Sequence, residues 1–178
     1  MKRGLALVAV GILALGVQGG LATLLPRGYC PDLGLLAVLA IGLQWRGMAS
    51  GMGIAAVLGY SADLLSGSLF GAHALLRILL FCCAYLARRQ LNLRGAVPLA
   101  VFAAGMTVLY SLGLLGLTSF FSAGVGLRWS EFGALLPQAV VNGVTAPLVA
   151  WGVDWLWDKL GDDAFRGGLE IDPRRPVA

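Results

Sequence analysis

The sequence predicts an all-α integral membrane protein, built as a bundle of six transmembrane helices. Of its 178 residues, 58% are hydrophobic and only 12% are charged, whereas about a quarter of the residues of a soluble domain are charged. The length fits about six helices of ~20 residues with short connections, and leaves no room for a separate soluble domain. The net charge of +4 comes from basic residues scattered at the expected helix ends, so it does not indicate nucleic-acid binding.

Each element follows from an apolar segment and its boundary. The first segment is longer than the apolar region of a signal peptide, so we expect a retained helix. The second is the shortest, which is also compatible with a tilted or re-entrant segment. The sixth contains Pro137 and Pro147 and should kink. The expected spans are 4–25, 32–43, 47–65, 69–86, 96–117 and 131–157, followed by a cytoplasmic tail, 158–178.

Lysine and arginine predict the orientation, because these residues concentrate in cytoplasmic loops. With the N-terminus inside, Arg27 and Arg128 lie outside and Arg77 lies within the fourth span. We therefore expect both termini in the cytoplasm, with tryptophans 45, 151, 155 and 157 near the inner interface. The basic residues then on the inner side are Lys2, Arg3, Arg46, Arg88, Arg89, Arg94, Lys159, Arg166, Arg174 and Arg175.

The most informative segment is a polar hairpin between the third and fourth spans. Asp63 precedes the turn at Ser66 and Gly67, and His73 and Arg77 follow four residues apart on one helix face. An unpaired charge inside the membrane costs about 3 kcal/mol on insertion scales. We therefore expect an Asp63–Arg77 pair that clamps the hairpin; the alternatives are a proton- or ion-coupled site and a contact with a partner.

His73 is the only histidine of the chain. No second histidine and no carboxylate–cysteine spacing accompanies it, so no metal site is predicted. Cys30, Cys82 and Cys83 show no metal-binding or disulfide pattern either. A hydrogen bond within the hairpin is the role we expect for His73.

Small residues recur every fourth position along the third span, at Gly47, Gly51, Ala55 and Gly59. Such a ridge lets two helices approach closely. We interpret it as internal packing; the alternative is a docking face for another protein's membrane helix. The same spacing recurs at glycines 16 and 20 and at glycines 67 and 71.

Gln138 and Asn142 share a face of the sixth span. Amide side chains within a membrane often bridge neighbouring helices or satisfy backbone groups freed by a proline. The alternative is the lining of a polar cavity. No catalytic triad, phosphate loop or pair of catalytic carboxylates is present, so we expect no enzyme activity and no cofactor.

Four motifs resemble the rod shape-determining protein family MreD. They are the segment 31–38, which opens with Pro31 and Asp32, the segments 59–67 and 71–75, and Asn142 with the segment 146–148. The resemblance implies a non-enzymatic component of the bacterial inner membrane that takes part in cell elongation. It also implies association with the bitopic protein MreC and, through it, with MreB filaments and the glycosyltransferase and transpeptidase of wall synthesis.

The MreD family is itself similar to the substrate-binding subunits of energy-coupling-factor transporters, which supplies a second hypothesis. In the first, the bundle is a scaffold that presents its glycine ridges and outer hairpin to partner helices. In the second, the protein is a small-molecule-binding subunit of a vitamin-type transporter, with His73, Gln138 and Asn142 lining its cavity. That reading requires a cavity of roughly 300 Å3 or more with converging polar groups.

Overall fold

The computed structural model describes residues 2–26, 28–45, 47–67, 69–91, 93, 95–121 and 129–165. All of the regular structure within these residues is helical, as predicted, and no strand occurs among them. The element order is α1 (Lys2–Leu24), α2 (Leu33–Gln44), α3 (Met48–Ser66), α4 (Ala72–Gln90), α5 (Ala96–Phe121) and α6 (Trp129–Phe165). Arg27, Arg46, Arg94, Arg128 and residues 166–178, on which part of the orientation and the tail prediction rest, lie outside the described residues.

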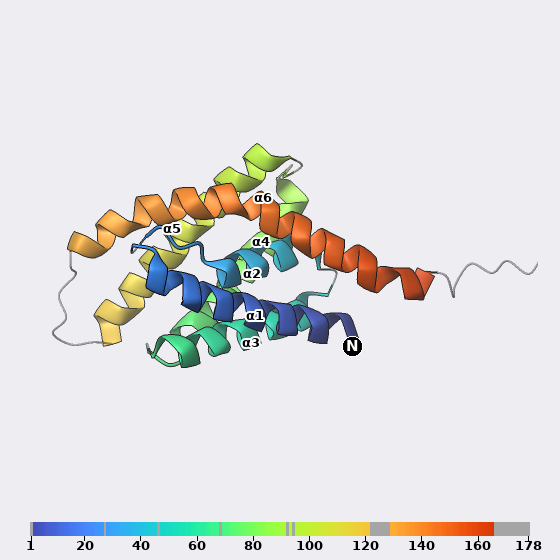
Figure 1. Ribbon diagram of the computed structural model, residues 1–178, viewed down its shortest axis with the longest axis horizontal. Coiled ribbons are helices and arrows are strands. Elements are labelled where there is room, and N and C mark those ends of the chain that lie inside the picture. The colour runs from blue at the N-terminus through green and yellow to red at the C-terminus, as the bar shows by residue number, and fades with distance from the viewer. Residues whose placement is uncertain are drawn as a thin grey trace, which may run out of the picture.

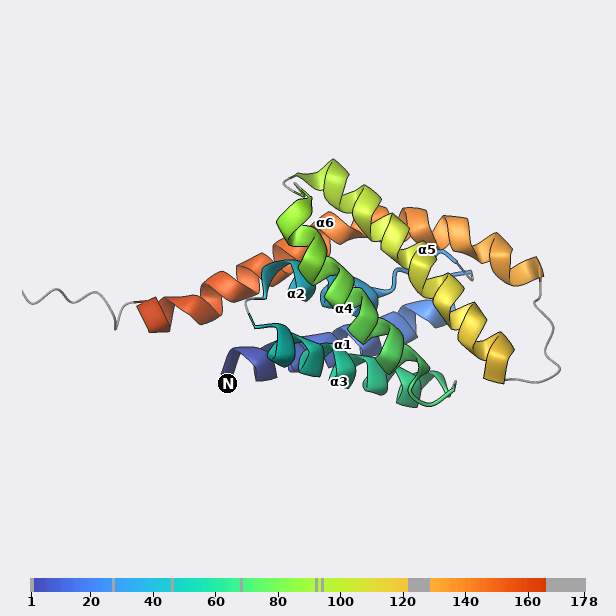
Figure 2. The same cartoon turned by 180° about the vertical axis from the view of Figure 1, so that it is seen from behind.

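Helix α2 occupies the centre of the molecule, with α1 on one side of it and α4 on the other (Figures 1 and 2). It packs against each of the other five helices. Its sequence explains this position, because no polar residue interrupts the helix before Gln44 at its end. With 12 residues α2 is about 18 Å long, so the helix alone is shorter than the ~30 Å hydrocarbon core of a bilayer.

Four helices are long and apolar enough to cross a membrane, by length and composition: Gly4–Leu24 of α1, α3, α5 and Gly133–Leu156 of α6. Helix α2 falls short in length, and α4 contains His73, Arg77 and two arginines in its last turn. Large apolar side chains, such as Leu5, Val97 and Leu136, are widely exposed on the outer helices. Exposed apolar surface on this scale is what a lipid-facing bundle requires.

The last helix is longer than predicted and is not straight. Pro137 and Pro147 both lie inside α6, which continues to Phe165 rather than ending at residue 157. The start of the predicted tail is therefore helical. Figure 1 shows that α6 changes direction near its middle, in agreement with the predicted kink.

The glycine ridge of α3 is an internal packing surface. Gly51, Ala55 and Gly59 are buried, whereas Gly47 is exposed and caps the start of the helix. A Cβ atom at Gly59 would lie 2.8 Å from the backbone nitrogen of Ala74 in α4. The third helix therefore approaches the backbone of α4 directly, and this face is not free for a partner.

Left-handed glycines form the turn between α3 and α4. Gly67 (φ +60°) ends α3, and Gly71 (φ +89°) begins α4. Because a side chain disfavours these angles, glycine is the residue that fits both positions. The turn brings the start of α4 back beside Asp63.

Candidate functional site

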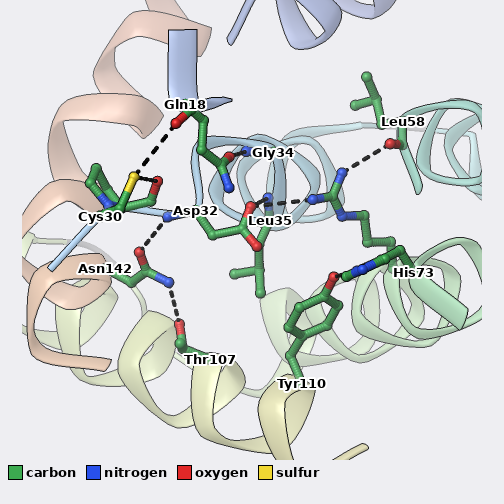
Figure 3. Close-up of polar contacts among 12 residues, drawn as sticks. Gln18, Cys30, Asp32, Gly34, Leu35, Leu58, His73, Thr107, Tyr110 and Asn142 are labelled. Carbon is green, nitrogen blue, oxygen red and sulfur yellow. Dashed lines mark hydrogen bonds and ion pairs between the residues drawn. The ribbon is translucent and has the colours of Figure 1, made fainter. Parts of the chain in front are cut away.

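A polar centre lies where α2, α4, α5 and α6 meet, and Figure 3 shows its contacts. Arg77 of α4 is 1% exposed. Its Nη2 atom lies 3.2 Å from Oδ1 of Asp32, and its Nη1 donates to the carbonyl oxygen of Leu58 at 2.9 Å. The predicted Asp63–Arg77 pair is therefore wrong. The acid that neutralises Arg77 comes from the start of α2 instead.

Asp32 joins three helices at one point. Its Oδ1 also accepts the backbone N–H of Leu35 at 2.9 Å, so it caps the N-terminus of α2. Its own backbone N–H donates to Oδ1 of Asn142 in α6 at 2.8 Å. Pro31 precedes it and accepts the N–H of Leu33. The Pro31-Asp32 motif thus positions α2 against α4 and α6.

The guanidinium of Arg77 is packed against backbone. A Cβ atom at Gly34 would lie 2.8 Å from both Nη1 and Nη2. Only glycine leaves room for the charged group between α2 and α4 at this position. Arg77 Nε is the one nitrogen of the group that has no hydrogen-bond partner among the described residues.

Asp63 has a different role from the one predicted. It is fully buried, at 0% exposure, and its carboxylate accepts the backbone N–H groups of Gly71 (3.1 Å), His73 (2.9 Å) and Ala74 (3.1 Å). These are the donors that the first turn of a helix leaves unsatisfied, and the partial positive charge there favours an anion. Asp63 therefore holds the hairpin together through the backbone of α4. Ser66 is exposed and lies outside this contact, donating to the Asp63 carbonyl at 3.4 Å.

Asn142 bridges helices, as its position on α6 predicted. It is fully buried; besides accepting from Asp32, its Nδ2 donates to Thr107 Oγ1 on α5 at 3.1 Å. The oxygen and the nitrogen of the amide thus each have a partner inside the protein, so Asn142 links α6 to the start of α2 and to α5. Gln138 lies one turn earlier and is half-buried, and no hydrogen bond joins it to the polar centre among the described residues.

The side chain of His73 is hydrogen-bonded to α5 and not to another residue of the hairpin. Its Nδ1 and the hydroxyl of Tyr110 are partners, and the two rings lie 5.8 Å apart. The side chain therefore ties α4 to α5, while its backbone N–H remains with Asp63. The prediction that His73 forms a hydrogen bond within the hairpin therefore holds for its backbone N–H and not for its side chain.

The polar centre continues to α1 through a weaker set of contacts. Gln18 Oε1 accepts the N–H of Gly34 at 3.4 Å, and the Cys30 thiol donates to the Gln18 carbonyl at 3.7 Å. Burial, and secondarily the negative charge of Asp32, raise the pKa of the Cys30 thiol above its usual value. Cys30 is therefore a protonated thiol and a poor nucleophile at neutral pH.

Several of these residues were not expected from the sequence, namely Gln18, Thr107 and Tyr110. Each is a polar side chain inside an apolar span, which is a signal for a buried contact. Their spacing along separate helices does not reveal which of them meet. Among the described residues, no group of three or more histidine, cysteine, aspartate and glutamate side chains is placed to hold a metal ion.

This geometry defines a multi-pass helical membrane protein whose interior is joined by a nearly saturated network of polar contacts around one buried ion pair. The chain belongs to the family of the rod shape-determining protein MreD, whose family model matches residues 7–153. No curated protein and no solved structure matches the chain. The similarity to energy-coupling-factor subunits accordingly stays a prediction.

Proposed function

We propose that the protein is a non-enzymatic scaffold of the bacterial elongation machinery, which binds MreC in the cytoplasmic membrane and helps to maintain rod shape. Membership of the MreD family supports the role in shape. The observation that carries the scaffold mechanism is that the polar side chains of the polar centre bond to one another and to the backbone. Asp32, Asn142 and Thr107 bond to one another and to backbone groups, so the charges of the interior stabilise the bundle.

The proposal places both termini in the cytoplasm. Arg88 and Arg89 end α4, and Lys159 lies near the end of α6, beyond Trp155. The N-terminus lies toward the same end of the molecule as the last turns of α6 (Figure 1). A positively charged end of this kind faces the cytoplasm under the positive-inside rule. Through MreC, the scaffold would be connected with MreB filaments and with the glycosyltransferase and transpeptidase of wall synthesis.

The surfaces left for a partner helix differ from those first expected. The ridge of α3 is used by α4 inside the bundle. On α1, in contrast, Gly16 and Gly20 are exposed, and nothing lies within 4 Å of the position a Cβ would take. Of the two ridges within spans, the α1 ridge is thus the one still accessible from the lipid.

Co-purification tests the scaffold directly. The tagged full chain is extracted from its native membrane in mild detergent, and the proteins that accompany it are quantified by mass spectrometry. We expect MreC to be enriched over a tagged multi-pass control protein expressed at the same level. Recovery of ATPase subunits or of a tightly bound small molecule, without MreC, would contradict the scaffold and support a transport subunit.

A further inference from the structure

A cavity of about 710 Å3 opens at the end of the bundle opposite the α3–α4 turn. It lies between the C-terminal ends of α2 and α4, the start of α5 and the second half of α6. Apolar residues, among them Leu43 and Leu99, form part of its wall. Its polar residues include Gln44, Arg88, Arg89 and Asp154. None of these four belongs to the polar centre described above.

The two arginines supply positive charge at the mouth. Arg88 is half-buried; it donates to the Trp45 carbonyl through Nη1, and its guanidinium lies 4.0 Å from the centre of the Tyr85 ring. Arg89 is exposed and lies 5.9 Å from the same ring. Neither arginine forms an ion pair with a carboxylate among the described residues. Their remaining N–H groups are therefore available to an anion such as a phosphate.

Two residues that carry acceptor oxygens, Gln44 and Asp154, line the same cavity. The Oε1 atom of Gln44 is buried and has no hydrogen-bond donor among the described residues, and a buried acceptor without a donor costs free energy. The Asp154 carboxylate is exposed at the wall formed by α6. These two groups call for a ligand that carries N–H or O–H donors as well as negative charge.

Residues of the kind found at a membrane interface lie beside the cavity. Trp151 and Trp155, in the same turns of α6 as Asp154, are 70% and 51% exposed. Lys159 lies 4.8 Å from the Trp155 ring. Exposed indoles followed by a cation are typical of the interface between lipid and water.

We propose that this cavity binds a phosphoethanolamine head group, supplied by the membrane lipid phosphatidylethanolamine. The phosphate accepts from Arg88 and Arg89, and the ammonium donates to Asp154 and Gln44. An acyl chain then continues along the apolar wall into the bilayer. A phosphocholine head lacks N–H donors, so it leaves Gln44 unsatisfied. The anionic phosphoglycerol head has no positive charge to place beside Asp154.

The test compares lipids that differ only in their heads. The full chain is purified in detergent and stripped of lipid, and its Tm is measured with added phosphatidylethanolamine, phosphatidylcholine or phosphatidylglycerol of identical acyl chains. We expect phosphatidylethanolamine to raise Tm by about 4 °C more than the other two. Equal shifts with all three lipids, or the largest shift with phosphatidylglycerol, would overturn the proposal. So would an equal shift with soluble phosphoethanolamine, which would assign the cavity to a free metabolite.

Variants locate the effect in the cavity. Gln44→Leu should abolish the preference for phosphatidylethanolamine over phosphatidylcholine, and Arg89→Gln should weaken the response to both. Arg89 is exposed, so its variant keeps the test valid if Gln44→Leu does not fold. Gln138→Leu changes the same side chain outside the cavity and should behave as wild type. A preference that survives in Gln44→Leu, or a response to both lipids in Arg89→Gln that equals that of wild type, would rule this site out.

Discussion

At the scale of single residues, four charged or amide-bearing side chains are buried in the part of the chain that the structure describes. Asp63 and Asn142 are fully buried, and Arg77 and Asp32 form an ion pair beside them. Charges in such surroundings are tolerated only when they are paired and hydrogen-bonded. The removal of both partners should therefore cost less than the sum of the two single removals.

A double-mutant cycle on the ion pair measures this. Asp32→Asn keeps an acceptor for the Leu35 N–H and removes only the charge, and Arg77→Met keeps the length of the side chain. Each single change should lower the free energy of unfolding by about 3–5 kcal/mol, because it leaves the other charge buried alone. The double variant should lose at least 1 kcal/mol less than the sum.

Equilibrium unfolding in mixed micelles supplies these free energies. Asp158→Asn is the control, since Asp158 is an exposed carboxylate on α6, and it should change stability by less than about 0.5 kcal/mol. Strict additivity of the two single variants would show that Asp32 and Arg77 do not interact.

Asp63 gives a second prediction at this scale. Asp63→Ala removes the acceptor of three backbone N–H groups, so it should lower the free energy of unfolding by about 2 kcal/mol or more. Asp63→Asn should lower it less, because the amide keeps one acceptor oxygen. The exchange Asp63→Arg with Arg77→Asp should not restore stability, because neither side chain faces the other's partners. The same unfolding measurement checks all three. Rescue by the exchange would contradict the capping role.

The sequence identified these four residues as candidate site residues, but it predicted the wrong partner for Arg77. Asp63 and Arg77 lie on the two helices of one predicted hairpin, so the sequence pattern predicts that they pair with each other. Asp32 lies 45 positions from Arg77 along the chain, and only the position of α2 between the other helices brings the two together. Such non-local contacts depend on packing, which a local pattern does not contain.

At the scale of elements, the contact between α3 and α4 depends on the absence of side chains. Gly59 touches the backbone of Ala74, whereas Gly53 on the same helix is exposed with nothing within 4 Å. The four-residue spacing predicted the buried positions Gly51, Ala55 and Gly59 of this ridge, because close helix contacts require small residues on one face, but its first member, Gly47, is exposed. The same spacing did not distinguish the buried α3 ridge from the exposed pair Gly16 and Gly20.

Paired alanine substitutions test the contact. Gly59→Ala should destabilise the protein by about 1–3 kcal/mol, since the backbone of α4 has to move away. Gly53→Ala should be neutral or slightly stabilising, because alanine favours the helix. Thermal unfolding of the two purified variants, side by side with wild type, compares them. Equal effects of the two changes would mean that α3 does not approach α4 at Gly59.

At the scale of the whole molecule, the arrangement places the shortest helix at the centre. The composition predicted six helices, and the described residues form six. The sequence pattern did not indicate that α2 would contact all the others. Helix α2 is also the shortest of the described helices. Burial explains the brevity, since a helix enclosed by protein does not need to match the thickness of the lipid.

Cysteine labelling tests whether α2 separates the two sides of the membrane. In a background with Cys30, Cys82 and Cys83 changed to alanine, Tyr29→Cys lies before α2 and Ala49→Cys lies after it; both positions are exposed. We expect an impermeant maleimide to label Tyr29→Cys in intact spheroplasts, and Ala49→Cys only after permeabilisation. Labelling of both positions in intact spheroplasts would mean that α2 does not cross.

The most direct test of the account is cell shape. The chain is depleted in the bacterium that carries it, and cell width is measured over several doublings. We predict that the cells widen into spheres, that wild-type chain restores rods, and that Asp32→Asn restores them less well in proportion to the folded protein in the membrane. Cells that keep their normal width after the chain is gone would contradict the role in rod shape.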